Sequence, residues 1–177
     1  MQRRRAVRFF EVLDERADGR GAGNQSPAGE DVISLTDGAP LAVLAESTSP
    51  WPKASGHEAG YQFGGYDLDQ RRRPTFMYSF GKVDVRDSFE AVEAKPNPQF
   101  KRTLTIQSKE APAGLWFRAA VSKKIETKDG FFVLDSGLRL KVDVPGATVR
   151  PAGGTAELLV PILLKDGAVT LTLNYVW

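Results

Sequence analysis

Apolar and polar residues alternate along much of this chain. The alternation is regular in four segments: Arg102–Ile106, Leu115–Val121, Leu138–Val144 and Val169–Trp177. Successive side chains of a β-strand point to opposite faces, so a period of two predicts strands with one face in the core and one in water. Such one-sided strands are typical of antiparallel sheets rather than of parallel sheets buried between helices.

Turn-forming residues separate the alternating segments. Asp129-Gly130 and Asp166-Gly167 favour tight hairpins, and Gly81-Lys82 predicts a type II′ turn. Pro161 has no amide hydrogen to donate, so its strand is expected at a sheet edge or at a bulge. About ten to twelve short strands at this spacing predict an all-β fold with little helix. We expect an antiparallel β-sandwich, with a flattened barrel as the alternative, because the sequence does not reveal whether a sheet closes.

The chain has 177 residues, which suits one domain. Residues 1–30 are expected to form a tail, or a first strand followed by a mobile loop. Val7–Leu13 reads either as a strand or as part of an apolar helical face, and residues 17–30 are rich in Gly, Asn, Ser and Pro. Residues 31–177 are predicted to form a single β-sandwich domain.

The composition excludes several classes of function. Basic residues number 24 and acidic residues 22, so the excess positive charge typical of nucleic-acid binding is lacking. There is no cysteine and only one histidine, which excludes thiolate metal sites, thiol nucleophiles and CxxCH haem attachment within this chain. The longest apolar run, Leu158–Leu164, is far shorter than the about 20 residues of a membrane-spanning helix. We therefore predict no catalytic residue, metal, cofactor or direct membrane insertion.

Two groups of residues resemble catalytic sites only loosely. Ser55, His57 and Glu58 are close in a loop, but no GxSxG motif surrounds the serine, so a surface histidine or a ligand contact is the preferred interpretation. Asp67 and Asp69 point to the same side of a strand end, where paired carboxylates could bind calcium or serve as acid and base. No EF-hand pattern follows them, and a polar hairpin end is the simpler interpretation.

Two further clusters suit binding. The first is the run Arg71, Arg72 and Arg73, whose guanidinium groups could hold a phosphate or carboxylate, although a solvated turn is the simpler interpretation. The second is aromatic and comprises Trp51, Tyr61, Phe63 and Tyr66. Flat rings can stack on sugars, and the competing interpretation places Tyr61 and Phe63 in the core with Trp51 as a lid.

Several segments together resemble a β-rich module of large secreted bacterial proteins. Those proteins combine a sorbosone- or glucose-dehydrogenase-like β-propeller, or similar domains, with a c-type cytochrome, and are often labelled membrane-bound dehydrogenase or haem-binding proteins. The resemblance covers roughly residues 31–177. Its segments are Asp31–Pro52, Gly60–Phe89, Arg102–Ile106, Leu115–Glu126, Glu157–Leu164 and Leu173–Trp177. The chain departs from the full proteins because it has no CxxCH motif and no room for a six-bladed propeller.

The resemblance implies a non-catalytic accessory module that acts beside a redox-protein domain. Whether the chain is a fragment of a larger protein stays open. The resemblance also implies a periplasmic or extracellular location. The start of the chain has no secretory leader pattern, so a cytoplasmic location stays open as an alternative. The competing functions are a free-standing carbohydrate-binding module and a small hydrolase or lyase that uses carboxylates. The candidate ligand-binding residues are Trp51, His57, Tyr61, Tyr66, Arg71, Arg72 and Arg73.

Overall fold

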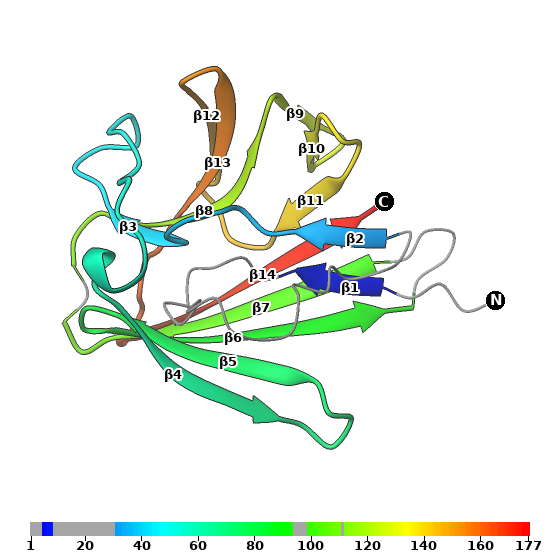
Figure 1. Cartoon of the computed structure of the whole chain (residues 1–177). Helices are drawn as coiled ribbons and strands as arrows, with labels where there is room; N and C mark the ends of the chain where they lie inside the picture. The colour runs from blue at the N-terminus through cyan, green and yellow to red at the C-terminus, as the bar shows by residue number, and fades with distance from the viewer. Residues whose placement is uncertain (1–4, 9–30, 94–98, 111) are drawn as a thin grey trace, which may run out of the picture.

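Two facing sheets with a core between them form most of the described part of the chain (Figure 1). The structure is a computed structural model and describes residues 5–8, 31–93, 99–110 and 112–177. The architecture is the predicted all-β sandwich. Both sheets end in separate edge strands, so the described residues do not form the flattened barrel. Their one helix is the short 3-10 helix η1 (Gly56–Ala59).

The larger sheet has eight strands in the order β4-β5-β6-β7-β14-β11-β10-β9. Their bounds are β4 Tyr61–Leu68, β5 Pro74–Phe80, β6 Val83–Val92, β7 Gln99–Gln107, β14 Ala168–Val176, β11 Arg139–Val142, β10 Phe131–Leu134 and β9 Ile125–Lys128. Every neighbouring pair is antiparallel. Strands β4 to β7 are neighbours in sequence and in space, whereas β14 enters the middle of the sheet between β7 and β11.

The smaller sheet has four strands in the order β12-β13-β8-β3. Their bounds are β12 Thr148–Ala152, β13 Thr155–Pro161, β8 Leu115–Ser122 and β3 Leu41–Val43. A separate pair, β1 (Arg5–Arg8) and β2 (Asp31–Ser34), is parallel and lies outside the two antiparallel sheets. A parallel pair needs a long connection rather than a hairpin. The predicted loop over residues 17–30 lies outside the described residues.

The hairpin turns are those that the dipeptides predict. Asp129 and Gly130 have φ values of 51° and 75°, and Asp166 and Gly167 have 53° and 79°. Positive φ at both central residues defines a type I′ turn, which Gly adopts freely and Asp tolerates. Gly81 has a φ of 57° between the paired residues Phe80 and Val83, as a type II′ turn requires.

Pro161 is also accommodated as predicted. The register between β13 and β8 shifts between Leu158 and Leu159, which is a β-bulge. Strand β12 pairs with β13 only as far as Leu159. Pro161 therefore lies beyond the reach of β12, and its missing amide hydrogen breaks no ladder on that side.

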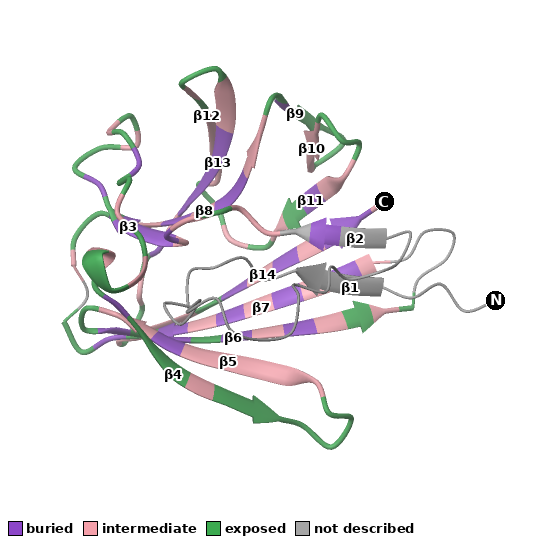
Figure 2. Ribbon diagram, viewed as in Figure 1, coloured by how far each residue is buried: buried purple, intermediate pink, exposed green. Residues whose placement is uncertain are grey.

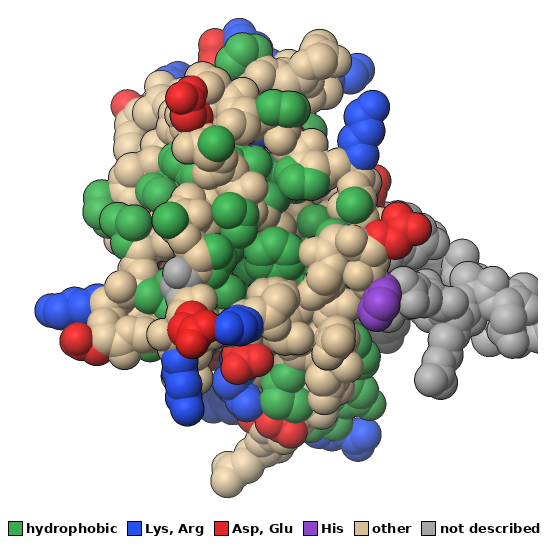
Figure 3. Space-filling model, turned by 90° about the vertical axis from the view of Figure 1, so that its left-hand side faces the viewer, with side chains coloured by type: hydrophobic (Ala, Val, Ile, Leu, Met, Phe, Trp, Pro, Cys, Tyr) green, Lys and Arg blue, Asp and Glu red, His purple; other side chains and the backbone are tan. Residues whose placement is uncertain are grey.

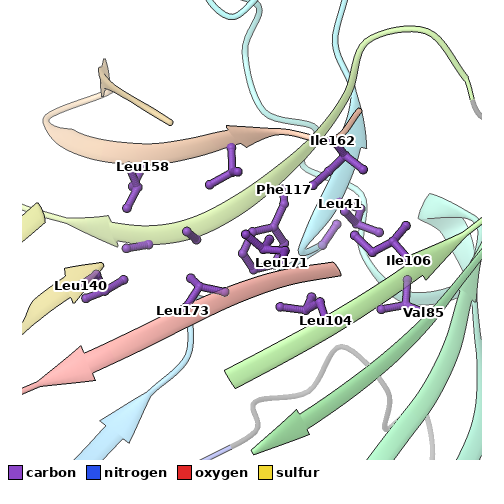
Figure 4. Close-up of a cluster of buried hydrophobic side chains, with 14 of the residues drawn as sticks. Leu41, Val85, Leu104, Ile106, Phe117, Leu140, Leu158, Ile162, Leu171 and Leu173 are labelled. Carbon is purple, nitrogen blue, oxygen red and sulfur yellow. The ribbon is translucent and has the colours of Figure 1, made fainter. Parts of the chain in front are cut away.

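The core lies between the two sheets. Figure 4 shows side chains from both layers meeting there, among them Leu104, Leu171 and Leu173 from the larger sheet and Phe117 and Leu158 from the smaller one. These side chains are essentially fully buried. Each contributes about 1.5–3 kcal/mol relative to an exposed position. In Figure 2 the buried residues gather in the central strands, whereas most of β4 is exposed at the edge of the larger sheet.

The described residues contain no helix that is long and apolar enough to cross a membrane.

Candidate functional site

Two of the predicted binding residues are structural in this fold. Trp51 is buried, with its indole Nε1 donating a hydrogen bond to the Ala39 carbonyl at 3.0 Å. The guanidinium of Arg118 lies over the Trp51 ring, 4.9 Å from its centroid. Trp51 also packs on the outer side of the smaller sheet against Leu159 and Trp116. The ring covers a second small core, so a sugar could reach it only if this loop opened.

Tyr61 binds the same segment as Trp51, residues 39–41, from its other side. Its hydroxyl accepts a hydrogen bond from the Leu41 amide at 2.6 Å and donates one to the Leu41 carbonyl at 2.8 Å. Its ring packs against Tyr78 and Phe80, with centroids 6.1 and 5.0 Å away. Trp51 and Tyr61 thus clamp the residues around Pro40. A ligand role for either residue stays a prediction, and its burial argues against that role.

The burial of three tyrosines makes the stability of the fold depend on pH above neutrality. It raises the pKa of Tyr61, Tyr78 and Tyr175 above the ordinary value. In the unfolded chain these phenols ionise at about pH 10. Above that pH, unfolding therefore releases protons that the folded state retains. The free energy of unfolding is therefore expected to fall as the pH rises above about 10.

Absorbance of tyrosinate and near-ultraviolet circular dichroism, followed together, test this expectation. Ionisation of the buried tyrosines should coincide with loss of the tertiary signal. A Tyr61→Phe variant should show a shallower dependence of stability on pH, because one buried ionisable group is gone. Full ionisation of all four tyrosines in a protein that keeps its tertiary signal would contradict the expectation.

The three consecutive arginines have different environments. Arg73 is bound within the hairpin, where its Nε donates to Asp69 at 2.7 Å and its Nη1 pairs with Glu90. Asp69 closes this turn, accepting the backbone amides of Arg71 and Arg73 at 2.8 and 2.9 Å. The Arg73 amide, its guanidinium and the Arg71 amide together hold the pKa of the Asp69 carboxyl below its usual value. The turn thus uses Arg73 structurally and leaves Arg71 and Arg72 exposed.

The surroundings of Arg71 do not favour an anion. It borders a polar hollow on the outer face of the larger sheet, which the basic residue Lys101 and the acidic residues Glu90, Glu93 and Asp143 also line. Positive potential strong enough to collect phosphate needs an excess of one charge. Phosphate or carboxylate binding by the arginines stays a prediction that this mixture of charges does not support.

Two carboxylates of the hydrolase hypothesis, Asp67 and Asp69, are engaged in ion pairs. Asp67 pairs with Arg86 at 3.0 Å, and Asp69 pairs with Arg73. His57 and Glu58 lie in η1 at the opposite end of β4, with exposed side chains. In the parts of the chain that the structure describes, no three His, Asp or Glu side chains are grouped so that they could hold a metal ion.

Tyr66 is the predicted residue that does lie on an accessible apolar surface. It is 57% exposed, and Phe63 and Leu68 of the same strand are 48% and 50% exposed. The ring of Phe76 from β5 lies beside that of Tyr66, with centroids 6.1 Å apart. In the β4–β5 register Phe63 is opposite the buried Tyr78, and Tyr66 is opposite Phe76.

The side chains of Phe63, Tyr66, Leu68 and Phe76, which we call the β4–β5 apolar face, therefore continue the inner face of the larger sheet. Phe76 packs against the main core, whereas Phe63, Tyr66 and Leu68 are exposed beside it. Figure 3 shows the end of the molecule at which β4 begins, with hydrophobic side chains among interspersed acidic and basic ones. No single charge dominates that end.

Two buried groups of paired charges were not predicted from the sequence. In the first, the guanidinium of Arg102 binds both carboxylate oxygens of Asp87 at 2.6–3.2 Å inside the core. Arg102 also lies over the rings of Phe89 and Phe117, 5.2 and 5.3 Å from their centroids. Burial disfavours the charged guanidinium, but the Asp87 carboxylate outweighs it and raises the Arg102 pKa.

The second buried cluster surrounds Glu157 of β13. Arg118 donates to one carboxylate oxygen at 3.1 Å, and Arg150 donates to the other at 2.6 and 2.9 Å. Both arginines also bind loop carbonyls, Arg118 that of Asp37 and Arg150 those of Ser47 and Ser49. This cluster fastens the loop that carries Trp51 to the outer side of the smaller sheet.

Comparisons of the chain with protein-family models, with curated proteins and with solved structures found no match.

Proposed function

We propose that this chain is a non-catalytic accessory module that holds another protein domain against its β4–β5 apolar face. The carrying observation is the joint exposure of Phe63, Tyr66 and Leu68 on the inner face of the larger sheet. Aromatic side chains exposed together and bordered by polar residues are typical of surfaces on which another polypeptide packs. Tyrosine and phenylalanine supply much contact area with few rotatable bonds.

The ion pairs that the carboxylates form with arginines support a non-catalytic role. Acid–base and nucleophilic catalysis need groups that converge on a substrate. Here Asp87 and Glu157 are buried against arginines, and Asp67 and Asp69 face arginines at the surface. Each of these carboxylates is engaged by an internal partner.

The resemblance of the sequence segments suggests which kind of protein the partner domain belongs to. We propose that the partner is a domain of an extracytoplasmic dehydrogenase- or cytochrome-type protein, and that the module itself binds no haem. The β4–β5 hairpin falls within Gly60–Phe89, one of the segments on which the resemblance rests. The proposal would make this hairpin the contact between module and redox domain.

A carbohydrate-binding module is the second candidate. The exposed rings of Tyr66 and Phe63 favour it, because such rings can stack on the C–H faces of a pyranose. The buried Trp51 and Tyr61 would be unavailable, so the platform would consist of fewer rings than the sequence suggests.

Photo-cross-linking distinguishes these proposals. A photoreactive phenylalanine analogue in place of Tyr66 is expected to give a product that contains a c-type cytochrome or dehydrogenase domain, when the chain is made in cells that produce such proteins. Mass spectrometry identifies the attached polypeptide. The matched control carries the analogue at Thr170, which is exposed on β14 in the middle of the sheet, and should give no such product.

Failure to find a redox domain among the Tyr66 products would overturn the proposed setting. Binding on a glycan array that a Tyr66→Ala substitution abolishes would favour the carbohydrate module instead.

A further inference from the structure

The free edge of the larger sheet at β4 is a second surface, which borders the β4–β5 apolar face. Strand β4 pairs with β5 on one side only, and most of its eight residues are exposed. Unpaired backbone groups along a sheet edge can pair with another strand, so proteins usually protect their edges with short strands, lysines, prolines or β-bulges.

The other edges of the two sheets carry such protection. Strand β3 has three residues, β12 contains Pro151, and β9 carries the exposed residues Glu126 and Lys128. Among the described residues, strand β4 is the longest of the four edge strands, and it has no lysine, arginine or proline. Its protection is limited to the bulge between Phe63 and Gly65. Its one charged residue, Asp67, is neutralised by Arg86 of the same sheet.

We propose that β4 pairs antiparallel with β4 of a second copy of this chain, about a two-fold axis between Gly64 and Gly65. This register places Phe63 opposite Tyr66 of the second copy, and Gln62 opposite Asp67 of the second copy. The bulge between Phe63 and Gly65 in the β4–β5 register brings Phe63 and Tyr66 to the same face despite their odd spacing. Apolar side chains therefore meet apolar ones, and the Gln62 amide meets a carboxylate on the other face.

No side chain lies at the centre of this pairing, because both residues beside the two-fold axis are glycines. Gly64 and Gly65 have no side chains, and a Cβ built at Gly65 would meet no atom within 4 Å. Two backbones can therefore approach each other there without a steric obstacle. The two-fold symmetry also makes each contact occur twice, as in an isologous dimer interface.

Charges at the two ends of β4 are complementary in the same register. Figure 1 shows η1 at one end of β4 and the β4–β5 turn at the other. An antiparallel second copy brings the turn with Arg71 level with Glu58 in η1 of the first copy, and the reverse contact is identical by symmetry. Both residues are exposed, and neither has an ion-pair partner among the residues that the structure describes. The contacts join two positive groups to two negative ones.

Engineered disulfides test the register directly, because the chain has no cysteine of its own. An equimolar mixture of Gln62→Cys and Asp67→Cys proteins is expected to form a cross-linked heterodimer under mild oxidation. Each variant alone should cross-link far less, since identical positions would be about 17 Å apart across the axis, beyond the reach of a disulfide. A mixture of Gln62→Cys with Thr170→Cys is the matched control and should remain uncross-linked.

Sedimentation of the unmodified full chain over a concentration series should show the mass of two copies at the upper end. Arg71→Glu is expected to weaken dimerisation about tenfold or more, because it places acids against the two Glu58 side chains. The double variant Glu58→Arg, Arg71→Glu should restore it.

A one-copy mass throughout, or single variants that cross-link as well as the mixture, would overturn the pairing. Either result would leave the apolar face and its proposed redox partner untouched, because the Tyr66 photo-cross-link does not require a dimer.

Discussion

An Asp87→Asn variant is expected to lose about 3–5 kcal/mol of unfolding free energy. The substitution preserves the shape of the side chain but leaves the Arg102 guanidinium charged inside the core, between the rings of Phe89 and Phe117. A buried charge without its counter-ion costs far more than an exposed ion pair contributes. Urea unfolding followed by fluorescence measures the change.

The control for this prediction is Asp84→Asn, which changes an exposed aspartate on the same strand and should alter stability little. The paired variant Asp87→Leu, Arg102→Met should recover most of the loss, since apolar groups can replace a buried pair at little cost. A loss below about 1 kcal/mol for Asp87→Asn would mean that the buried charge is compensated in another way.

A Glu157→Gln variant is expected to lose about 2–4 kcal/mol and to loosen one loop selectively. Glu157 neutralises both Arg118 and Arg150, and Arg150 in turn holds the carbonyls of Ser47 and Ser49. Without the carboxylate, two arginines are left close together and partly buried. Hydrogen exchange by mass spectrometry should show faster exchange in residues 44–51 than in β7 or β14.

Glu126→Gln is the matched control, because Glu126 is exposed and pairs only at the surface with Lys124. It should leave both stability and loop exchange nearly unchanged. Uniformly faster exchange across the sandwich in Glu157→Gln would contradict a local fastening role for this cluster, since it would mean that only global stability had changed.

The strands and turns could be predicted because their signals are local. The alternation over Leu115–Val121 and Val169–Trp177 corresponds to β8 and β14, and the Asp-Gly turns occur where the dipeptides are. Strand order is a non-local property. That β14 pairs with β7 and β11 depends on which edges meet during folding, and no short segment encodes it.

The buried charges left a partial signal in the sequence. Arg102 falls in phase with Leu104 and Ile106, and Asp87 in phase with Val85 and Phe89, so two opposite charges occupy the apolar side of neighbouring strands. A charge on the core side of a strand needs a partner, and the pair follows from that requirement once the strands are adjacent. Glu157 gave no such signal, because the loop with Trp51 covers the second face of β13 and residues 157–160 are all buried.

The sequence predicted a set of candidate binding residues but not which of them would be exposed. Aromatic residues near Trp51 and Tyr66 look alike in sequence, yet Trp51 and Tyr61 became anchors for the residues around Pro40 while Tyr66 stayed outside. The difference lies in how far the smaller sheet covers the larger one. That extent is a property of the assembled layers and not of any one strand.

The position of β14 restricts the order of assembly during synthesis. A nascent chain halted before Ala168 can form the β4-to-β7 meander, but the edges of β7 and β11 that β14 would join stay unsatisfied. Such a truncated product leaves two strand edges unpaired and core side chains exposed, and is a target for chaperones and proteases. The molecule should therefore acquire resistance to digestion only after β14 has been synthesised and has paired with β7 and β11.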